Sequence, residues 1–184
     1  MKKLVVDSYS KGSKWLHWIV AMIVMAMLSF SFFLGNVPEQ YQSTAYMIHK
    51  SLGLTVLFLM CARLFWIVRT GRPELPFTVS TWERVLTRVV QTSMYLLLFA
   101  MPIVGWVMSV AAGRTPTYFG LFDVPLPGIP IDKQLSHTMG TAHCTIAWIL
   151  IVLISLHILG ALKHYFINKD RILHRMLGDF RKNV

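Results

Sequence analysis

Four long apolar runs constrain this chain more than any other feature of its sequence. They fall at about residues 15–34, 44–68, 91–112 and 141–167. At a rise of about 1.5 Å per residue, roughly 20 helical residues match a hydrocarbon core of about 30 Å. The runs therefore predict four membrane-spanning helices, and an even number of spans places both ends of the chain on the same side.

The composition agrees with a lipid environment. Hydrophobic residues make up 55% of the 184 positions and charged residues only 14%, whereas soluble domains carry charge at about a quarter of their residues. No repeat occurs, and no stretch between the runs is rich enough to fold separately. We therefore expect one all-α domain over residues 1–184, an integral membrane four-helix bundle.

The first apolar run follows several lysines, as in a signal peptide. However, this run is a full membrane span long, and no small-residue cleavage site follows it. We interpret it as a retained first helix.

The basic residues are distributed unevenly between the two sides of the predicted bundle. Lys and Arg are retained on the cytoplasmic side of membranes, and the two sides hold fifteen and three of them. The larger set is Lys2, Lys3, Lys11, Lys14, Arg63, Arg69, Arg72, Arg84, Arg88, Lys163, Lys169, Arg171, Arg175, Arg181 and Lys182; the smaller is Lys50, Arg114 and Lys133. Both termini are thus predicted to be cytoplasmic. The net charge of +10 then signals orientation, and no nucleic-acid partner is expected.

Four of the seven histidines form two pairs at matching depths in the predicted spans. His17 begins the first span on the cytoplasmic side, and His157 lies in the cytoplasmic half of the fourth. His49 begins the second span on the periplasmic side, near the level of His143. Ionisable side chains inside a membrane are costly and indicate a functional site by default.

The spacing within the fourth span favours two bulky cofactors. His143 and His157 are fourteen residues apart, which is about 21 Å and four turns, and they return to the same helix face within roughly 40°. They cannot share one metal ion. Two haems, each bound by a histidine pair, fit this pattern.

Other interpretations of these histidines are weaker. A single histidine near a span end is commonly an interfacial residue, but two level pairs are hard to obtain that way. Zinc or copper would need further ligands, and no Asp, Glu or second Cys lies within a turn of the paired histidines. Cys61 and Cys144 form no CxxCH motif, so any haem must be non-covalent.

Two further residues of the second span point toward the same cofactors. Arg63 lies fourteen residues after His49 on the same face, where its guanidinium could pair with a haem propionate or snorkel to lipid phosphate. Gly53 lies one turn after His49 and would let a flat macrocycle approach, although glycine is also common at helix contacts in membranes. In the third span, Pro102 and Gly105 predict a kink.

His164 continues the heptad series of the fourth span and emerges about 10 Å past His157 at the cytoplasmic surface. A histidine there could supply protons to a reducible substrate, and Lys163 could assist it. The alternative is a solvated histidine in a basic segment that also holds Lys169.

Several segments together resemble the bacterial cytochrome b561 family of di-haem, four-helix membrane proteins. They are WLHW around His17, MIHKSLG around His49, MPIVGWVMS in the third span, and H-x13-H from His143 to His157 followed by LKHYFINKD. The resemblance covers nearly the whole chain.

This resemblance implies two haem b groups bound by His17, His49, His143 and His157 in the bacterial inner membrane. It also implies electron exchange with ubiquinone near His164. In some members the donor is periplasmic superoxide. The external charges of this chain balance, because Lys50, Arg114 and Lys133 face Glu39, Asp123 and Asp132, so the donor stays open.

Two classes of function follow. The chain is either a quinone-reducing oxidoreductase, or an electron-relay or membrane-anchor subunit for a separate periplasmic redox or lipid-binding partner. The proline-rich external segment 113–140 could serve the second class as a lid or docking surface.

Overall fold

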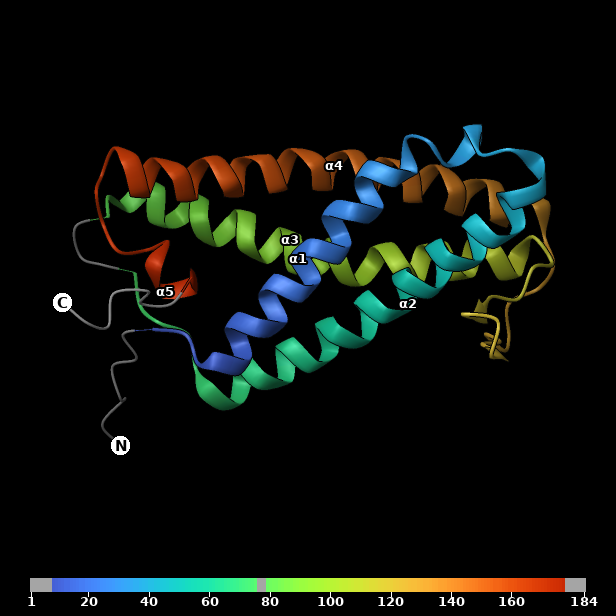
Figure 1. The fold of residues 1–184 in the computed structure, drawn as a ribbon, viewed down its shortest axis with the longest axis horizontal. Coiled ribbons are helices and arrows are strands. Elements are labelled where there is room, and N and C mark those ends of the chain that lie inside the picture. The colour runs from blue at the N-terminus through green and yellow to red at the C-terminus, as the bar shows by residue number, and fades with distance from the viewer. Residues whose placement is uncertain (1–7, 76–78, 178–184) are drawn as a thin grey trace.

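The computed structural model describes residues 8–75 and 79–177. Its long helices are α1 (Lys11–Ser31), α2 (Glu39–Thr70), α3 (Thr81–Ala111) and α4 (Lys133–Phe166) (Figure 1). Each is long and apolar enough to cross a membrane, which confirms the predicted all-α four-helix membrane bundle. Four basic residues used to predict its orientation, Lys2, Lys3, Arg181 and Lys182, lie outside the described residues.

All four helices begin before the predicted spans, most of all α3 and α4, whereas α1 ends at Ser31, before the predicted residue 34. At the start of α3, the Glu83 carboxylate accepts hydrogen bonds from the backbone N–H and the hydroxyl of Ser80. At the start of α4, Asp132 accepts from the backbone N–H groups of Gln134 and Leu135. Since these helices are 31 and 34 residues long, their ends project past a hydrocarbon core of about 30 Å.

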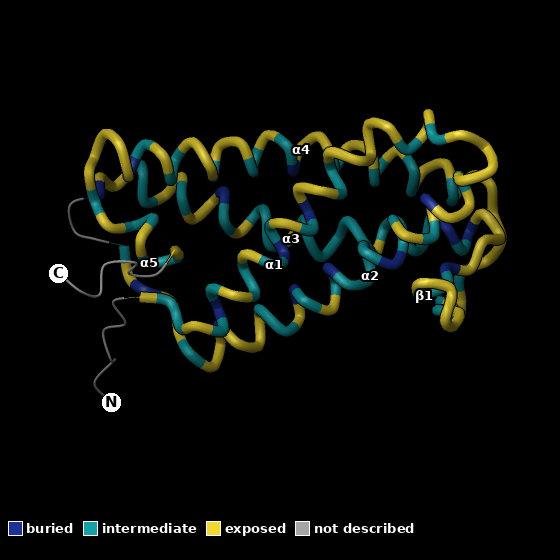
Figure 2. Tube along the Cα trace, viewed as in Figure 1, coloured by how far each residue is buried: buried dark blue, intermediate teal, exposed yellow. Residues whose placement is uncertain are grey.

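The long helices pack mainly in three pairs. α3 packs against α4, and α2 packs against both α1 and α3. Val20 and Val24 of α1 meet Val56 and Met60 of α2 in a buried cluster. Elsewhere most of the chain is partly or fully exposed (Figure 2). Large apolar side chains on this outer surface, such as Phe58 at 72% exposed, suit contact with lipid tails.

The segment between α3 and α4 forms a hairpin bound to α2. Its strands are β1 (Thr117–Tyr118) and β2 (Phe122–Asp123), which pair antiparallel. The fully buried Ser51 hydroxyl accepts from the Phe119 N–H at 2.8 Å and lies 3.1 Å from the Thr117 carbonyl. Thr55 of α2 bonds the Tyr118 hydroxyl at 3.1 Å. These hydrogen bonds hold the segment against α2, so the segment is an ordered part of the fold.

Two short helices complete the described fold: η1 (Leu34–Asn36) follows α1, and α5 (His174–Leu177) follows α4. The Trp18 indole of α1 donates to the Met176 carbonyl of α5 at 3.3 Å. The start of α1 and α5 thus lie at the same end of the bundle, on the left of Figure 1.

Candidate haem sites

The structure brings together both histidine pairs that the spacing predicts. His49 of α2 and His143 of α4 have ring centroids 6.3 Å apart and planes inclined at 69°. His17 of α1 and His157 of α4 also have centroids 6.3 Å apart, with planes at 67°. The helix α4 therefore supplies one histidine to each pair.

This separation tests what the pairs could hold. An imidazole nitrogen lies roughly 1.1 Å from its ring centroid, given bond lengths of about 1.3 Å, and a metal–imidazole bond is about 2.0 Å long. Two imidazoles on opposite sides of one metal ion would therefore have centroids roughly 6.2 Å apart. A direct N–H···N hydrogen bond would bring them to roughly 5.1 Å. The observed 6.3 Å fits a shared metal ion.

The donor set favours a metal that brings its own ligands. Across residues 8–75 and 79–177, no group of three or more His, Cys, Asp or Glu could hold an ion. Each site thus offers two imidazoles, which matches the two axial positions of a haem and falls short of a closed zinc site.

The surroundings of His143 orient its ring toward His49. Its Nδ1 lies 3.1 Å from the Met101 carbonyl of α3. Because a carbonyl can only accept, this hydrogen bond places the proton on Nδ1 and leaves Nε2 for a metal. On α3, a Cβ added to Gly105 would lie 2.9 Å from His143 Cε1. Gly105 therefore makes room for the ring, a role that reading it as a helix kink missed.

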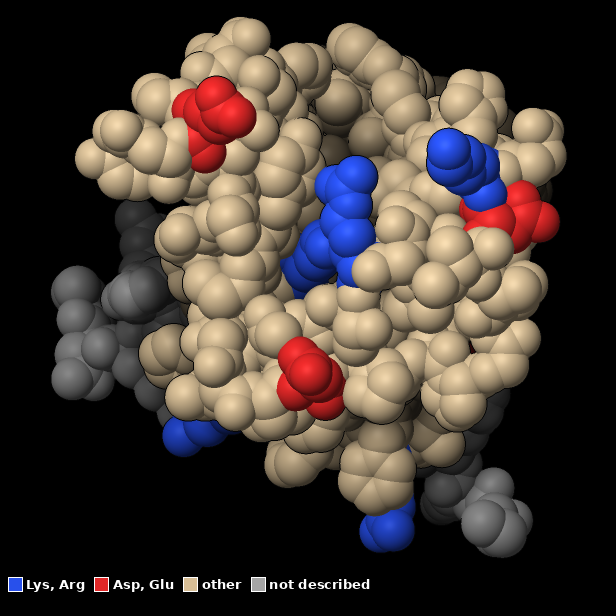
Figure 3. Space-filling view, turned by 90° about the vertical axis from the view of Figure 1, so that its right-hand side faces the viewer, with Lys and Arg blue, Asp and Glu red and all other residues tan. Residues whose placement is uncertain are grey.

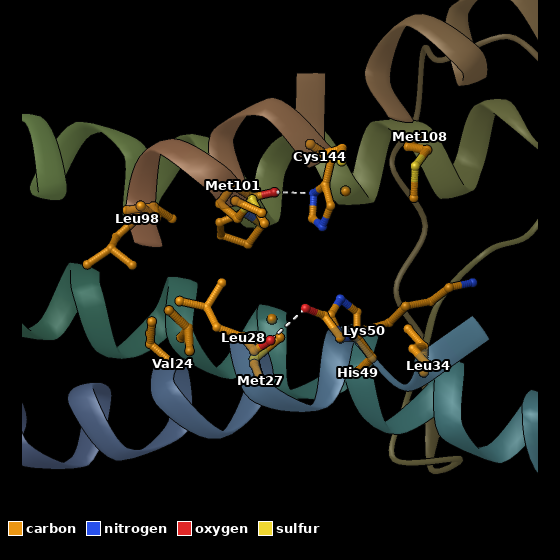
Figure 4. A pocket seen from close by; sticks show the side chains of 18 of the residues that line it. Val24, Met27, Leu28, Leu34, His49, Lys50, Leu98, Met101, Met108 and Cys144 are labelled. Carbon is orange, nitrogen blue, oxygen red and sulfur yellow. Dashed lines mark hydrogen bonds between the residues drawn. The ribbon is translucent and has the colours of Figure 1, made fainter. Parts of the chain in front are cut away.

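A cavity of about 450 Å³ opens beside His49 and His143, between the four long helices. Figure 4 shows His49 and Lys50 of α2 across this cavity from Met101 of α3. The volume lies within the range of about 300–1,000 Å³ that is usual for small-molecule sites. Gly53 also lines the cavity, and a Cβ there would meet only the Met27 methyl, at 3.9 Å. This wall is thus mainly apolar and open beside Gly53.

Arg63 lies near the pair formed by His17 and His157, and it faces the bundle interior. Its guanidinium carbon is 5.4 Å from the ring centroid of Tyr95 on α3, and its charge acts on both His17 and His157. Arg63 Nε and His17 Nδ1 are buried, and neither has a hydrogen-bond partner within the described residues. This position differs from a guanidinium that snorkels to the lipid surface.

His164 is buried rather than emerging at the surface as expected, with only 7% of the residue exposed. The turn after α4 covers it: Nδ1 lies 2.6 Å from a carboxylate oxygen of Asp170 and 3.1 Å from Asn168 Nδ2. The neighbouring Lys163 forms an ion pair with Glu83 of α3 and lies over the Trp82 ring at 5.7 Å. Both predicted quinone-site residues therefore have acidic partners.

The charges at the end of the bundle that carries the hairpin are arranged unevenly. Lys50 lines the cavity beside His49, and Arg114 lies close enough to Lys50 for their charges to repel. Figure 3 shows this end of the bundle, with basic side chains in a central hollow and acidic side chains toward the rim. The balanced charge count thus conceals a positive centre.

Known proteins resemble the chain over most of its length. A family profile described as prokaryotic cytochrome b561 matches residues 8–179. "Cytochrome b561 homolog 2" of Escherichia coli (strain K12) is 33% identical over 174 residues, which cover 94% of the chain and 92% of that relative. "Probable superoxide oxidase CybB" of Yersinia pestis is 32% identical over 162 residues, which cover 88% of the chain and 91% of that relative.

Proposed function

The chain belongs to the prokaryotic cytochrome b561 family, and we propose that it holds two haem b groups and carries electrons from a periplasmic donor to ubiquinone. Membership identifies a bacterial membrane electron-transfer protein and implies b-type haem. Beyond family membership, we propose that the protein holds two haems, that ubiquinone is the acceptor, and that the chain lies in the inner membrane with both termini in the cytoplasm. The observation that most supports the proposal is that the ring centroids are 6.3 Å apart in both histidine pairs.

Bound haem would supply one-electron transfer, and the protein residues would hold and orient it. His49 and His143 would ligate one group, and His17 and His157 the other. The Met101 carbonyl would keep His143 in the tautomer that leaves Nε2 free. Gly53 lines the open wall of the first site.

At the acceptor end, His164 and Lys163 would serve the quinone. Reduction of a quinone to a quinol consumes two protons with two electrons, so a residue that delivers protons is required. His164 can deliver one from its second ring nitrogen while Asp170 holds Nδ1. Lys163 lies one residue away, and its ion pair with Glu83 would hold its ammonium group beside this site.

At the donor end, the basic centre formed by Lys50 and Arg114 favours an anion. Positive charge in a recess raises the local concentration of anionic substrates and their association rate. Superoxide is such an anion, and one relative is described as a probable superoxide oxidase. We therefore propose superoxide as the donor.

A second function, electron relay for a separate redox or lipid-binding partner, is favoured by the external hairpin. Leu121 is 77% exposed and Phe122 59% exposed, which would suit a docking surface. Reduction of the purified protein by superoxide, followed by oxidation by quinone without a second protein, would support the enzyme. Inertness to both reagents would support the relay.

Removing one histidine from each pair tests the proposed haem sites. We expect the pyridine haemochrome assay to give two haems in the unchanged protein and one in His143→Ala or His157→Ala. Electron paramagnetic resonance should show that each variant keeps a different low-spin signal. The exposed His137 provides the control His137→Ala, which should keep both.

One haem in the unchanged protein would contradict the two-site proposal. Loss of the same signal from both variants would contradict the depth assignment.

A further inference from the structure

Two arginines share one tyrosine ring at the His17–His157 end of the bundle. The guanidinium carbon of Arg63, on α2, lies 5.4 Å from the Tyr95 ring centroid. That of Arg72, just after α2, lies 5.3 Å from the same centroid. We call Arg63, Arg72 and Tyr95 the Tyr95 cluster. Cation–π attraction stabilises each guanidinium, but it does not remove the repulsion between them.

No carboxylate among the described residues balances the two guanidinium charges of the cluster, of which Arg63 is partly buried and Arg72 exposed. In the part of the chain that the structure describes, the ion pairs are Lys163–Glu83 and His164–Asp170, so no carboxylate there pairs with Arg63 or Arg72.

Two hydrogen-bond donors of the cluster also have no partner among the described residues. Arg63 Nε and the Tyr95 hydroxyl are buried, and within residues 8–75 and 79–177 neither has a hydrogen-bond partner. Buried polar groups are costly unless they are paired. An anion between these groups would satisfy the two donors and both charges.

Tyr9, just before α1, belongs to the same surroundings. Burial raises the pKa of Tyr9 above its ordinary value of 10.0, whereas the charge of Arg72 lowers it. Arg63 and Arg88 act in the same direction as Arg72. The Tyr9 phenol therefore shares the electrostatic surroundings of these guanidinium groups.

Resting on the proposed haem sites, we propose that the Tyr95 cluster binds the propionate carboxylates of the haem held by His17 and His157. A guanidinium matches a carboxylate with two parallel hydrogen bonds. Haem is favoured over a free anion because Tyr95 packs against the buried cluster that holds Val20, three residues after His17 on α1, and Met60, three residues before Arg63 on α2. An anion bound there would therefore lie beside the group that His17 and His157 hold.

Haem release from variants with one propionate partner removed tests this proposal. The protein would carry His143→Ala, so that only the haem at His17 and His157 remains. It would be loaded either with protohaem or with protohaem dimethyl ester, which lacks both carboxylates. Transfer to excess apomyoglobin in detergent would then give the release rate.

With protohaem, we expect Arg72→Gln and Tyr95→Phe to release haem about tenfold faster, as for the loss of a charge-assisted hydrogen bond. With the dimethyl ester, neither change should alter the rate, because the carboxylates are already absent. Arg69→Gln is the matched control. Arg69 lies near the same helix end but stacks on Phe65 at 5.0 Å, so its loss should leave both rates unchanged.

Equal effects of Arg72→Gln on protohaem and ester would overturn the propionate assignment and leave the haem site intact. Unchanged haem release together with weaker binding of inorganic phosphate would assign the cluster to a phosphate instead. Failure of the His143→Ala protein to bind either haem would count against the proposed function and not against the cluster alone.

Discussion

The ring of His143 is positioned by two residues of α3. Met101 accepts its Nδ1 proton at 3.1 Å, and Gly105 leaves the space into which the ring fits. Neither contact involves a metal or a side-chain partner. Backbone atoms of one helix thus set both the tautomer and the position of a proposed ligand on another helix.

Gly105→Ala should disturb this site selectively. The added Cβ would lie 2.9 Å from His143 Cε1, and overpacking of this kind costs about 1–3 kcal/mol. We expect roughly tenfold weaker haem binding at His49 and His143, with the other site unchanged. Haem titration of the apoprotein would measure this, with Gly35→Ala as the control because its Cβ would meet nothing within 4 Å. Two unaltered affinities would show that the ring has room to move.

The two histidine pairs were predictable, whereas their neighbours were not. Depth along each apolar run and the fourteen-residue step are properties of one helix and follow from its rise. Gly105 faces His143 because of the way α3 and α4 are rotated relative to each other. The residue spacing within one apolar run does not determine that rotation. The position of Asp170 also depends on the turn that folds it back onto His164.

Asp170→Asn should slow quinone reduction while both haems remain. The variant keeps Oδ1, which accepts from the Ile172 N–H, but it loses the carboxylate that holds His164 Nδ1. Since a positioned acid contributes about 10²–10⁴-fold to a rate, we expect its misplacement to cost about tenfold. Stopped-flow oxidation of the pre-reduced protein by quinone would measure this.

His164→Ala should slow the same step, and the double variant should be no slower than His164→Ala alone. Asp123→Asn, in the external hairpin, is the matched control. An undiminished rate in His164→Ala would place proton delivery elsewhere. Loss of a haem would instead make His164 a ligand and contradict the assignment of His157.

At the scale of elements, expectation and structure differ at helix ends. Hydropathy identifies the part of a helix that needs lipid, so it placed the start of the third span near residue 91. The helix begins at Thr81, because Ser80 and Glu83 cap a first turn that is polar. Similarly, Asp132 starts α4 well before the apolar run. The capping residues were visible in the sequence. Each is a local signal, however, and hydropathy averaged over a whole span does not detect it.

The hairpin should depend on Ser51. In Ser51→Ala, the Phe119 N–H would lose its partner at 2.8 Å and the Thr117 carbonyl its contact at 3.1 Å. An unsatisfied buried group costs about 1–3 kcal/mol, so the free energy of unfolding should fall by that amount. Proteolysis within the segment 113–132 should accelerate, as followed by mass spectrometry in detergent. Ser155→Ala is the control, because that hydroxyl bonds only within α4, to Ile151. Equal proteolysis of both variants would show that other contacts hold the hairpin.

At the scale of the whole molecule, charge predicts orientation and not the arrangement of a surface. Counting Lys and Arg on each side predicts cytoplasmic termini, and counting acids and bases on the external side predicts no net charge. Lys50 lines the cavity, and its nearness to Arg114 depends on how α2 and the segment after α3 meet. It could therefore be found only from the structure.

Labelling of engineered cysteines would test the orientation. In a protein with Cys61 and Cys144 replaced by serine, Leu121→Cys should react with a membrane-impermeant maleimide added to spheroplasts, because Leu121 is 77% exposed on the hairpin. Arg171→Cys, at the opposite end of the bundle, should react only after the membrane is opened. The reverse pattern would contradict the predicted cytoplasmic termini.

The unequal surroundings of the two histidine pairs have a thermodynamic consequence. His143 donates to a carbonyl, which makes its imidazole a stronger electron donor and favours ferric iron. His17 Nδ1 has no such partner within the described residues, so its imidazole is the weaker electron donor and favours the ferrous state. A cation lies near each pair, Lys50 beside His49 and Arg63 near His17 and His157, so the difference between the two sites comes from the histidine hydrogen bond. The midpoint potential should therefore rise from the His49–His143 site to the His17–His157 site, so that an electron entering at the external end moves downhill across the membrane.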